Sequence, residues 1–281
     1  MKKLKLLLAS VFAIMSIFSF AGCDVLGDLF GDNDDVVGTY KFNAFVSMRQ
    51  TLDTTSDDFK VIYIEDERFE IGDMYQIKFA EVQCYANMVV LDLKKDNTFL
   101  LVEPCTILGV GEYGKWEKDG EQITLKGKGK DYILTQKDDI LALKWGNEAY
   151  GSFTNIELKK TEIIEKEELK EVAALYKFSL MTQSLGEESI TVNVGEIVEG
   201  KKFGEEFFVV DLKANGEFFV LADAMFGLRD GAVGTWTKDG EQILLDLGVG
   251  EEYIIRFNLS GDAMSFSFTD EGIFVSLTLK K

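Results

Sequence analysis

The residues of this 281-residue sequence best suited to chemistry are three cysteines and 49 acidic residues, and the sequence has no histidine. A cysteine nucleophile needs a base to form its thiolate, and imidazole is the usual base near neutral pH. The absence of histidine therefore excludes a Cys-His pair, a Ser-His-Asp triad and a histidine-ligated zinc. Paired carboxylates could hydrolyse glycosides, but no acidic pair has a spacing that singles it out. We expect no enzymatic activity, no catalytic residue, no bound metal and no other cofactor.

A glycine-rich run, Gly109–Gly114, fits the G-x-G-x-x-G pattern of dinucleotide-binding loops. That pattern binds a cofactor only when a strand precedes it and a helix follows it within a βαβ unit. Here the chain continues through Lys115 and Trp116 in a strand-like pattern, and a related segment, Arg229–Gly234, lacks the motif. The sequence therefore predicts a turn at this position.

The N-terminus combines three lysines, an apolar run of 15 residues (Leu6–Phe20) and a small-residue pair before Cys23. The apolar run is shorter than the roughly 20 residues of a spanning helix. The segment resembles a bacterial lipoprotein signal, with Phe20–Cys23 at the position of the lipobox. The resemblance implies cleavage before Cys23, lipid attachment to Cys23 and an extracytoplasmic protein anchored to a bacterial membrane. The alternatives are an ordinary secretory signal and an uncleaved anchor, with Cys23 incidental.

Residues 1–22 are thus the expected signal peptide, and residues 23–35 the expected tether. Asp24–Asp35 contains five acids and no base, which is typical of a solvated spacer. A calcium loop would need glycine at its sixth position and glutamate at its twelfth, and this spacing is absent. The formal net charge of −19 excludes a nucleic-acid partner, because that binding depends on lysine and arginine.

An internal duplication dominates the rest of the chain. Gly114–Leu125 matches Gly234–Leu245 almost residue for residue, and Val90–Phe99 matches Val209–Phe218. The first copy carries roughly 16 extra residues between its first strand and its Leu-Asp-Leu strand, as the offsets between matching segments show. The sequence predicts two tandem domains, residues 36–160 and 172–281, joined by residues 161–171.

Each copy has the pattern of an antiparallel sheet with tight turns. Apolar and polar residues alternate in the Leu-Asp-Leu strand, as they do in a half-buried strand. Residues that tolerate positive φ stand between apolar runs at hairpin positions: Asp96-Asn97, Asp119-Gly120, Gln136–Asp139, Asn215-Gly216, Asp239-Gly240 and Ser260–Asp262. The linker, Thr161–Glu171, consists largely of helix-forming residues and predicts a short helix.

The order of motifs resembles that of lipocalin-like domains. Gly38-Thr39-Tyr40 opens the first copy, a Leu-x-Leu-x-x-Asp-x-Thr-Phe hairpin follows, and Gly-x-Trp-x-x-Asp-Gly comes next. The resemblance implies an all-β fold of two tandem antiparallel up-and-down β-barrels. It also implies a non-enzymatic binding protein with a small apolar or amphipathic ligand in one or both barrels. The alternative is an interaction module whose filled barrels contact protein or glycan through their loops; the sequence identifies no protein partner and no ligand-binding residue.

Four features of the copies are candidate sites or core positions. Cys84 and Cys105 could form a disulfide outside the cytoplasm, and the alternative is two buried thiols. Trp116 and Trp236, at matching positions, are expected in the cores, with a role as ligand platforms as the alternative. The phenylalanines of the second copy could fill its barrel: Phe203, Phe207, Phe208, Phe218, Phe219 and Phe226. The acidic insert Leu52–Asp58 is expected to be a solvated loop, with a weak cation or partner contact as the alternative.

Overall fold

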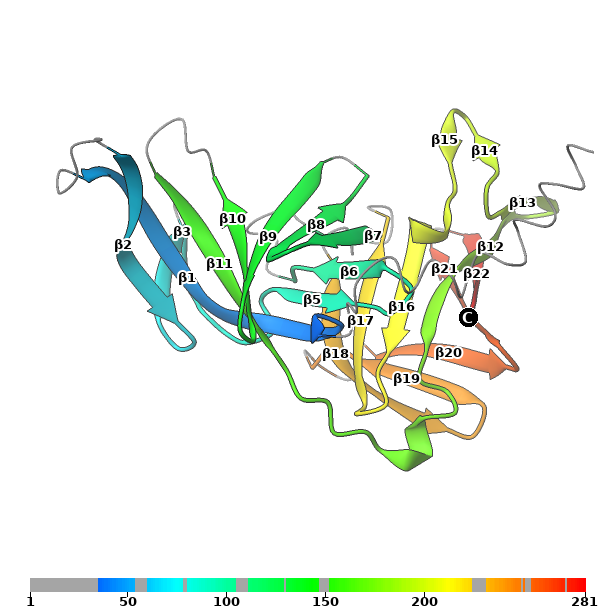
Figure 1. The fold of residues 1–281 in the computed structure, drawn as a ribbon. Helices are drawn as coiled ribbons and strands as arrows, with labels where there is room; N and C mark the ends of the chain where they lie inside the picture. Colours follow the sequence, from blue (N-terminus) through cyan, green and yellow to red (C-terminus); the bar gives the residue numbers. More distant parts are fainter. Residues whose placement is uncertain are drawn as a thin grey trace, which may run out of the picture. The chain divides into compact units, whose positions relative to one another are not determined.

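The protein folds into two closed antiparallel barrels of eight strands each, in a computed structural model (Figure 1). Gly38–Lys281 form one compact unit that contains both barrels. The structure describes residues 35–53, 60–77, 80–104, 111–128, 130–146, 152–223, 231–248, 250, 254–270 and 272–281. The expected signal peptide, Cys23 and the expected tether up to Asp34 lie outside these residues. The all-β fold of two up-and-down barrels expected from the resemblance to lipocalin-like domains is confirmed.

Barrel 1 closes where its first strand pairs with its last, with Tyr40 opposite Lys160. Its eight strands are β1 (Gly38–Asp53), β5 (Val90–Leu93), β6 (Thr98–Val102), β7 (Glu112–Asp119), β8 (Gln122–Lys126), β9 (Asp131–Lys137), β10 (Ile140–Trp145) and β11 (Ser152–Lys160). Three further strands precede β5: β2 (Lys60–Glu70), which pairs with the outer part of β1, and the hairpin of β3 (Met74–Ile77) and β4 (Ala80–Gln83).

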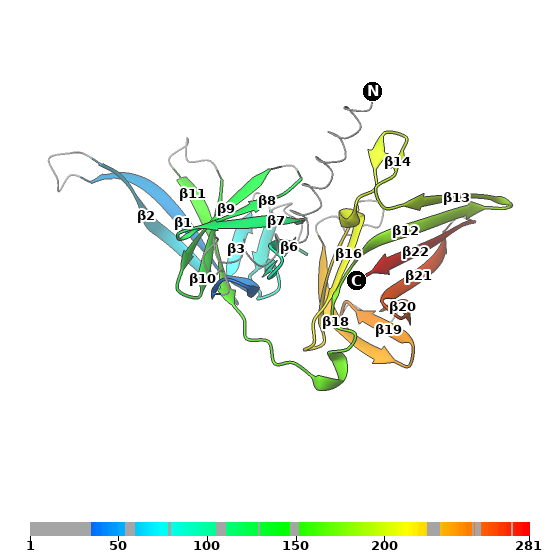
Figure 2. The same ribbon diagram turned by 45° about the vertical axis from the view of Figure 1, so that its right-hand side comes forward.

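Barrel 2 repeats this plan and closes by pairing β12 with β22, with Lys177 opposite Lys280. Its strands are β12 (Leu175–Leu185), β16 (Phe208–Leu212), β17 (Glu217–Ala222), β18 (Ala232–Asp239), β19 (Gln242–Asp246), β20 (Ile254–Ser260), β21 (Ala263–Asp270) and β22 (Ile273–Lys280). Figure 2 shows β13 (Glu188–Asn193) along the outer part of β12. The small hairpin of β14 (Ile197–Val198) and β15 (Lys201–Lys202) and a 3-10 turn (Glu205–Phe207) precede β16.

The hairpin turns lie where the sequence predicted them. Asn97 and Asp138 adopt φ of 59° and 55° in the first copy, and Gly216 and Gly261 adopt 89° and 59° in the second. Gly120 and Gly240 occupy matching turns at 60° and 58°. These residue types reach the left-handed region at low cost, so they set the strand register of both copies.

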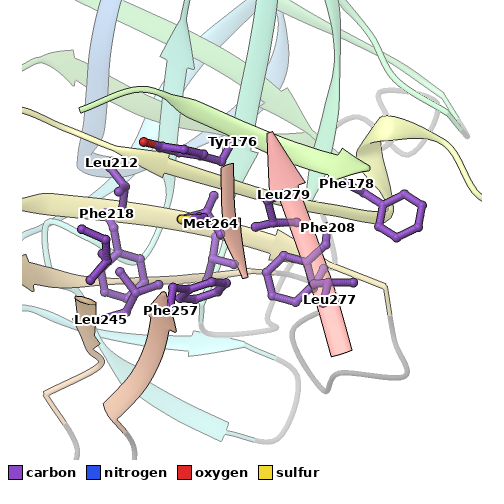
Figure 3. Close-up of a cluster of buried hydrophobic side chains, with 14 of the residues drawn as sticks. Tyr176, Phe178, Phe208, Leu212, Phe218, Leu245, Phe257, Met264, Leu277 and Leu279 are labelled. Carbon is purple, nitrogen blue, oxygen red and sulfur yellow. The ribbon is translucent and has the colours of Figure 1, made fainter. Parts of the chain in front are cut away.

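A continuous cluster of buried side chains fills the interior of barrel 2. Figure 3 draws 14 of them and labels ten, which come from strands all around the barrel. Trp236 belongs to this cluster, and its indole N–H donates to the carbonyl of Lys213 at 2.8 Å. Trp116 is equally buried in barrel 1 and donates to the carbonyl of Lys94 at 3.1 Å. Both tryptophans are core residues, as predicted.

The Leu-Asp-Leu strands differ from the half-buried strands that the sequence predicted. Every residue of β5 and of β16 is buried, the polar ones included. The reason is that the outer face of these strands packs against the other barrel. Phe219 also lies at this contact, in a cluster with Val90 and Leu100, and so does not fill barrel 2 as expected. Phe226 lies outside the described residues.

The linker between the barrels is less helical than predicted. Its only described helix is one 3-10 turn, Glu167–Leu169, and no side chain caps its start at Lys166. Instead, the Lys166 amide donates to the carbonyl of Ala214 at 2.8 Å, and Leu169 is buried against barrel 2. Isolated short helices are marginal in water, so these tertiary contacts outweigh the helix propensity of the segment.

Candidate functional site

The clearest candidate site is at the seam between β9 and β10 of barrel 1. These strands pair only from Ile140–Lys137 to Leu143–Leu134. Beyond the last pair they separate, and a hollow of about 420 Å³ opens between Lys130–Ile133 and Lys144–Gly146. We call this the first hollow. Two lysines and one acid, Asp131, line it, so it is cationic in a strongly acidic protein.

Aromatic rings hold both lysines of the first hollow in place. The Lys130 ammonium lies 4.4 Å from the ring centroid of Trp145 and 4.8 Å from that of Tyr132. Lys144 lies 4.5 Å from the Phe153 centroid and 5.9 Å from that of Tyr63. Such cation–π contacts stabilise a cation by about 0.5–1 kcal/mol at exposed sites. They position the ammonium groups of two exposed side chains.

The phenol of Tyr132 remains neutral in this setting. Burial, together with the negative charge of Glu112, raises the pKa of Tyr132 to about 12. The ring therefore offers an uncharged π-face to Lys130 over the physiological pH range.

A second hollow of about 520 Å³ adjoins the first on the outer face of barrel 1, and Lys144 lines both. Its lining has mixed charge, with Arg68, Lys137 and Lys144 facing three acids. Arg68 Nη2 donates to Glu157 Oε2 at 2.6 Å, and this contact together with Glu70 raises the pKa of the guanidinium against the opposing effect of burial. The second hollow thus offers many hydrogen-bonding groups with little net charge.

Barrel 2 provides an internal comparison, because it has the same fold with different residues at these positions. By strand register, Lys144 and Trp145 correspond to Ser267 and Phe268, and the barrel 2 segment that aligns with Lys130, Leu247–Tyr253, contains no lysine. The fold therefore does not require two lysines and a tryptophan at this seam. Their presence in barrel 1 alone marks the seam as a specific surface.

A second cluster of charged residues lies between the barrels; we call Asp92, Lys94, Asp211 and Lys213 the ionic cluster. Lys94 Nζ lies 2.8 Å from Asp211 Oδ2, and Lys213 Nζ lies 2.7 Å from Asp92 Oδ1. Lys213 Nζ also lies 3.0 Å from Asp211 Oδ2, and Lys94 Nζ lies 2.8 Å from Asp92 Oδ2. The contact between Lys94 and Asp92 is electrostatic, because Asp92 Oδ2 accepts no well-directed hydrogen bond from the described residues. Asp92 and Asp211 are only 3% and 2% exposed. The cluster is therefore a buried ring of two positive and two negative charges.

The cluster shifts the proton affinity of its members. Burial alone would raise the pKa of Asp92, but the charges of Lys213 and Lys94 outweigh burial and hold it well below its usual range. Burial would likewise lower the pKa of Lys94, but Asp211 and Asp92 raise it. Thr39 Oγ1 also donates to Asp92 Oδ1 at 2.6 Å. All four charges are compensated within the cluster, whose ion pairs connect the two barrels.

The contact between the barrels has internal two-fold character. Asp92 and Lys94 are the counterparts of Asp211 and Lys213 in the repeat. The apolar residues around the cluster are also matched pairs: Val90 with Val209, Leu100 with Phe219, and Val102 with Leu221. Each barrel thus contributes the same patch to the contact.

The remaining predicted site residues have different outcomes. Cys84 is buried, but Cys105 lies outside the described residues, so a disulfide between them stays a prediction. The acidic insert begins at the end of β1, which stops at Asp53, and the rest of it also lies outside the described residues. The glycine-rich run leads into strand β7 at Glu112 rather than into a helix, which fits no dinucleotide loop.

Two absences concern the described part of the chain alone. No three acidic or cysteine side chains there are grouped so that they could hold a metal ion. None of its helices has the length and apolar character needed to cross a membrane.

The sequence contains a signal for each of the two charged sites, although the alternation of apolar and polar residues along the strands identifies neither site. Asp and Lys two residues apart recur in both copies, on one face of an otherwise apolar strand. The lysines of the seam are absent from the second copy. Comparing the copies position by position identifies both features.

Comparisons with known proteins give little beyond this. No family model matches the chain, and no curated protein matches it. Among solved structures, two crystal structures of mutants of the vaccine antigen Transferrin Binding Protein B from Haemophilus parasuis Hp5 are similar. One is a double mutant, with 6% identity and a TM-score of 0.22; the other is a single mutant, with 7% and 0.21. Each alignment covers 86% of this chain and 75% of the other. A likeness at this level carries no functional conclusion.

Proposed function

We propose that this protein is a lipid-anchored, extracytoplasmic binding module without enzymatic activity, and that its binding surface is the seam of barrel 1. The observation that carries the proposal is the pair of ring-supported lysines, Lys130 at the first hollow and Lys144 at the boundary of the two hollows. The filled interior of barrel 2 supports outer-surface binding over an internal ligand for that barrel. A small apolar ligand inside barrel 1 stays a prediction.

The ligand that fits this surface is an acidic polysaccharide. The Lys130 ammonium at the first hollow and the Lys144 ammonium over Phe153 of the second hollow would each pair with a carboxylate or sulfate group, and charge-assisted contacts of this kind are strong. Lys144 lines both hollows, which suits a ligand made of repeating units. The mixed charges of the second hollow would hydrogen-bond to the hydroxyl groups of the next unit.

Replacing Lys144 by serine should weaken binding of galacturonic-acid oligomers at least tenfold, because one charge-assisted hydrogen bond contributes about 1.5–3 kcal/mol. Serine is the residue that barrel 2 has at this position, so the fold tolerates it. Isothermal titration calorimetry on the full chain measures the affinity. Lys130→Glu, which reverses the charge of the other lysine at the first hollow, should have at least as large an effect.

The matched control is Lys238→Ser, since Lys238 is an exposed lysine on β18, outside the seam. It should leave the affinity unchanged, and neutral maltose oligomers should not bind. Equal binding of acidic and neutral oligomers, or equal losses in the Lys144 and Lys238 variants, would refute the proposed site.

The anchor has its own test. The Cys23→Ser variant should incorporate no radiolabelled palmitate in a bacterial host, because the lipid-bearing thiol is gone. Cys84→Ser is the matched control and should retain labelling. Labelling that persists in the Cys23 variant would rule out lipidation at this residue.

A further inference from the structure

The inner face of barrel 2 continues beyond the closed barrel onto four outer strand segments. β12 pairs with β13 on one side and β22 on the other, and β22 pairs with β21 (Figure 2). We call the wing the part of β12 that follows Met181, together with the segments of β13, β21 and β22 that lie beside it. Directly paired residues share a face, so Leu185 with Ile273, and Ile190 with Gln183, lie on the same side as the core residue Met181.

Apolar exposure rises steeply along this face. Met181 and Val192 at the base of the wing are 4% and 3% exposed, whereas Leu185 and Ile190 near its tip are both 61% exposed. Leu185, Ile190 and Ile273 line a hollow of about 530 Å³ together with polar residues of β12 and β13. The wing thus presents an apolar surface that is continuous with the core but open to solvent.

Barrel 1 shows that the fold does not need apolar residues here. Both first strands have a bulge at matching positions, Phe42/Ala44 and Phe178/Leu180, which aligns the two wings. Counted from this bulge and along the paired strands, Leu185, Ile190 and Ile273 of barrel 2 correspond to Arg49, Glu67 and Ser152 of barrel 1. The apolar character of the barrel 2 wing is therefore a property that folding alone does not explain.

The edges of the two wings differ in the same way. Strand β13 has one neighbour, β12, among the described residues, so its other edge carries backbone groups able to pair with a further strand. Ser189–Val192 on this edge is uncharged. The corresponding edge strand of barrel 1, β2, carries four carboxylates within Glu65–Glu70. Charges on an edge strand oppose pairing, so Ser189–Val192, which follows Glu188 at the start of β13, is the less protected of the two edges.

Barrel 1 also shows what kind of group covers such a face. Tyr75, on the short strand β3, stacks on Phe45 with 4.3 Å between ring centroids and meets Phe69 edge-on at 5.0 Å. An extended segment with an aromatic side chain thus covers the base of the barrel 1 wing. In barrel 2 the corresponding hairpin has only two residues in each strand, and the tip of the wing stays exposed.

We propose that the barrel 2 wing is a docking site for an extended segment of a partner protein, which adds to β13 as a further strand. Backbone hydrogen bonds to the free edge would give affinity. Aromatic or branched apolar side chains at alternate positions of the segment would pack on Leu185, Ile190 and Ile273 and give specificity. The site is independent of the barrel 1 seam and takes a partner of different chemistry.

The test uses a displayed library of random 12-residue peptides, selected on the full chain. Selected peptides should share an alternating apolar pattern. Their affinity should fall at least tenfold in the triple variant Leu185→Arg, Ile190→Glu, Ile273→Ser, which installs the barrel 1 residues. Successive amides of an extended peptide point to opposite edges, and only one edge pairs with β13. N-methylation of every second amide should therefore weaken binding when the methylated amides face β13 and should have no effect when they face away.

The controls separate this site from its competitors. Arg49→Leu alters the matched position of barrel 1 and should leave peptide affinity unchanged. If circular dichroism shows that the triple variant is misfolded, the single change Leu185→Arg at the exposed tip serves instead. The proposal is overturned if selected peptides bind the variants equally or tolerate N-methylation at every position. It is also overturned if no peptide is selected while the wing binds the dye 1-anilinonaphthalene-8-sulfonate or pairs two copies of the chain in sedimentation.

Discussion

Replacing Asp92 by alanine should lower the free energy of unfolding by about 3–5 kcal/mol, the range found when one partner of a buried ion pair is removed. Asp92 contacts two buried ammonium groups, and without it Lys213 and Lys94 share one carboxylate, that of Asp211. The excess positive charge then lies in a site nearly closed to water. Urea denaturation followed by tryptophan fluorescence measures the change.

The duplication supplies the matched control for this prediction. Asp211→Ala removes the counterpart carboxylate and should cost a similar amount, whereas Asp239→Ala, at an exposed turn, should change stability by less than about 0.5 kcal/mol. Adding Lys213→Met to Asp92→Ala should recover part of the loss, because it removes the uncompensated charge. A loss below about 1 kcal/mol for Asp92→Ala would contradict the role assigned to the ionic cluster.

The pH dependence of the same variant follows from the shifted pKa values. The pKa of Asp92 is lowered, so its contribution is present above the unfolded-state value of about 3.9 and is lost as the pH falls through the folded value. The pKa of Lys94 is raised, so its contribution is present below about 10.4 and is lost as the pH rises through its folded value. The stability difference between wild type and Asp92→Ala should therefore be largest between about pH 4 and 10 and should narrow in acid.

Replacing Trp236 by alanine should destabilise the protein by about 3–5 kcal/mol. The indole is buried in the core of barrel 2, and its removal leaves a large cavity. The change also removes the hydrogen bond to the carbonyl of Lys213, whose side chain belongs to the ionic cluster. Denaturation in urea, followed by circular dichroism, tests this without relying on the deleted fluorophore.

The other two tryptophans provide comparisons for the loss of stability in Trp236→Ala. Trp116→Ala should cost about as much, because Trp116 is the barrel 1 counterpart with the same kind of hydrogen bond. Trp145→Phe copies barrel 2 and should change stability by less than about 1 kcal/mol, since Trp145 lies at the open seam. Similar losses for Trp145→Phe and Trp236→Ala would contradict the division between core and surface tryptophans.

Much of the fold was predictable because it depends on local patterns. Asn97, Gly120 and Gly240 stand at turns that need positive φ, and the runs between them alternate with a period of two. Because the domain is duplicated, each turn residue and each alternating run occurs twice in the sequence. The linker helix over Thr161–Glu171 was over-predicted, because helix propensity says nothing of the Ala214 carbonyl that binds the Lys166 amide.

The sites were harder to predict because they depend on which face of a strand is covered. Asp92 and Asp211 look like ordinary solvent-facing residues until a second barrel covers them. Phe219 was assigned to an interior for the same reason: one strand buries both faces, and sequence alone does not show what covers the outer one. Lys130 and Trp145 lie 15 residues apart in sequence and meet because the antiparallel pairing of β9 and β10 brings the start of one strand beside the end of the other.

The matched patches between the barrels have a consequence for assembly. A surface that presents Asp and Lys two residues apart, surrounded by apolar residues, can pair with a second copy of itself related by a two-fold axis. On a protein with a single barrel, such a surface would cause the chain to dimerise, and the fraction of dimer would depend on the protein concentration. Here both halves belong to one polypeptide, so each patch meets its mate at a fixed one-to-one ratio. The association is thereby independent of how much protein the cell makes, and the self-complementary surface is unavailable to other molecules.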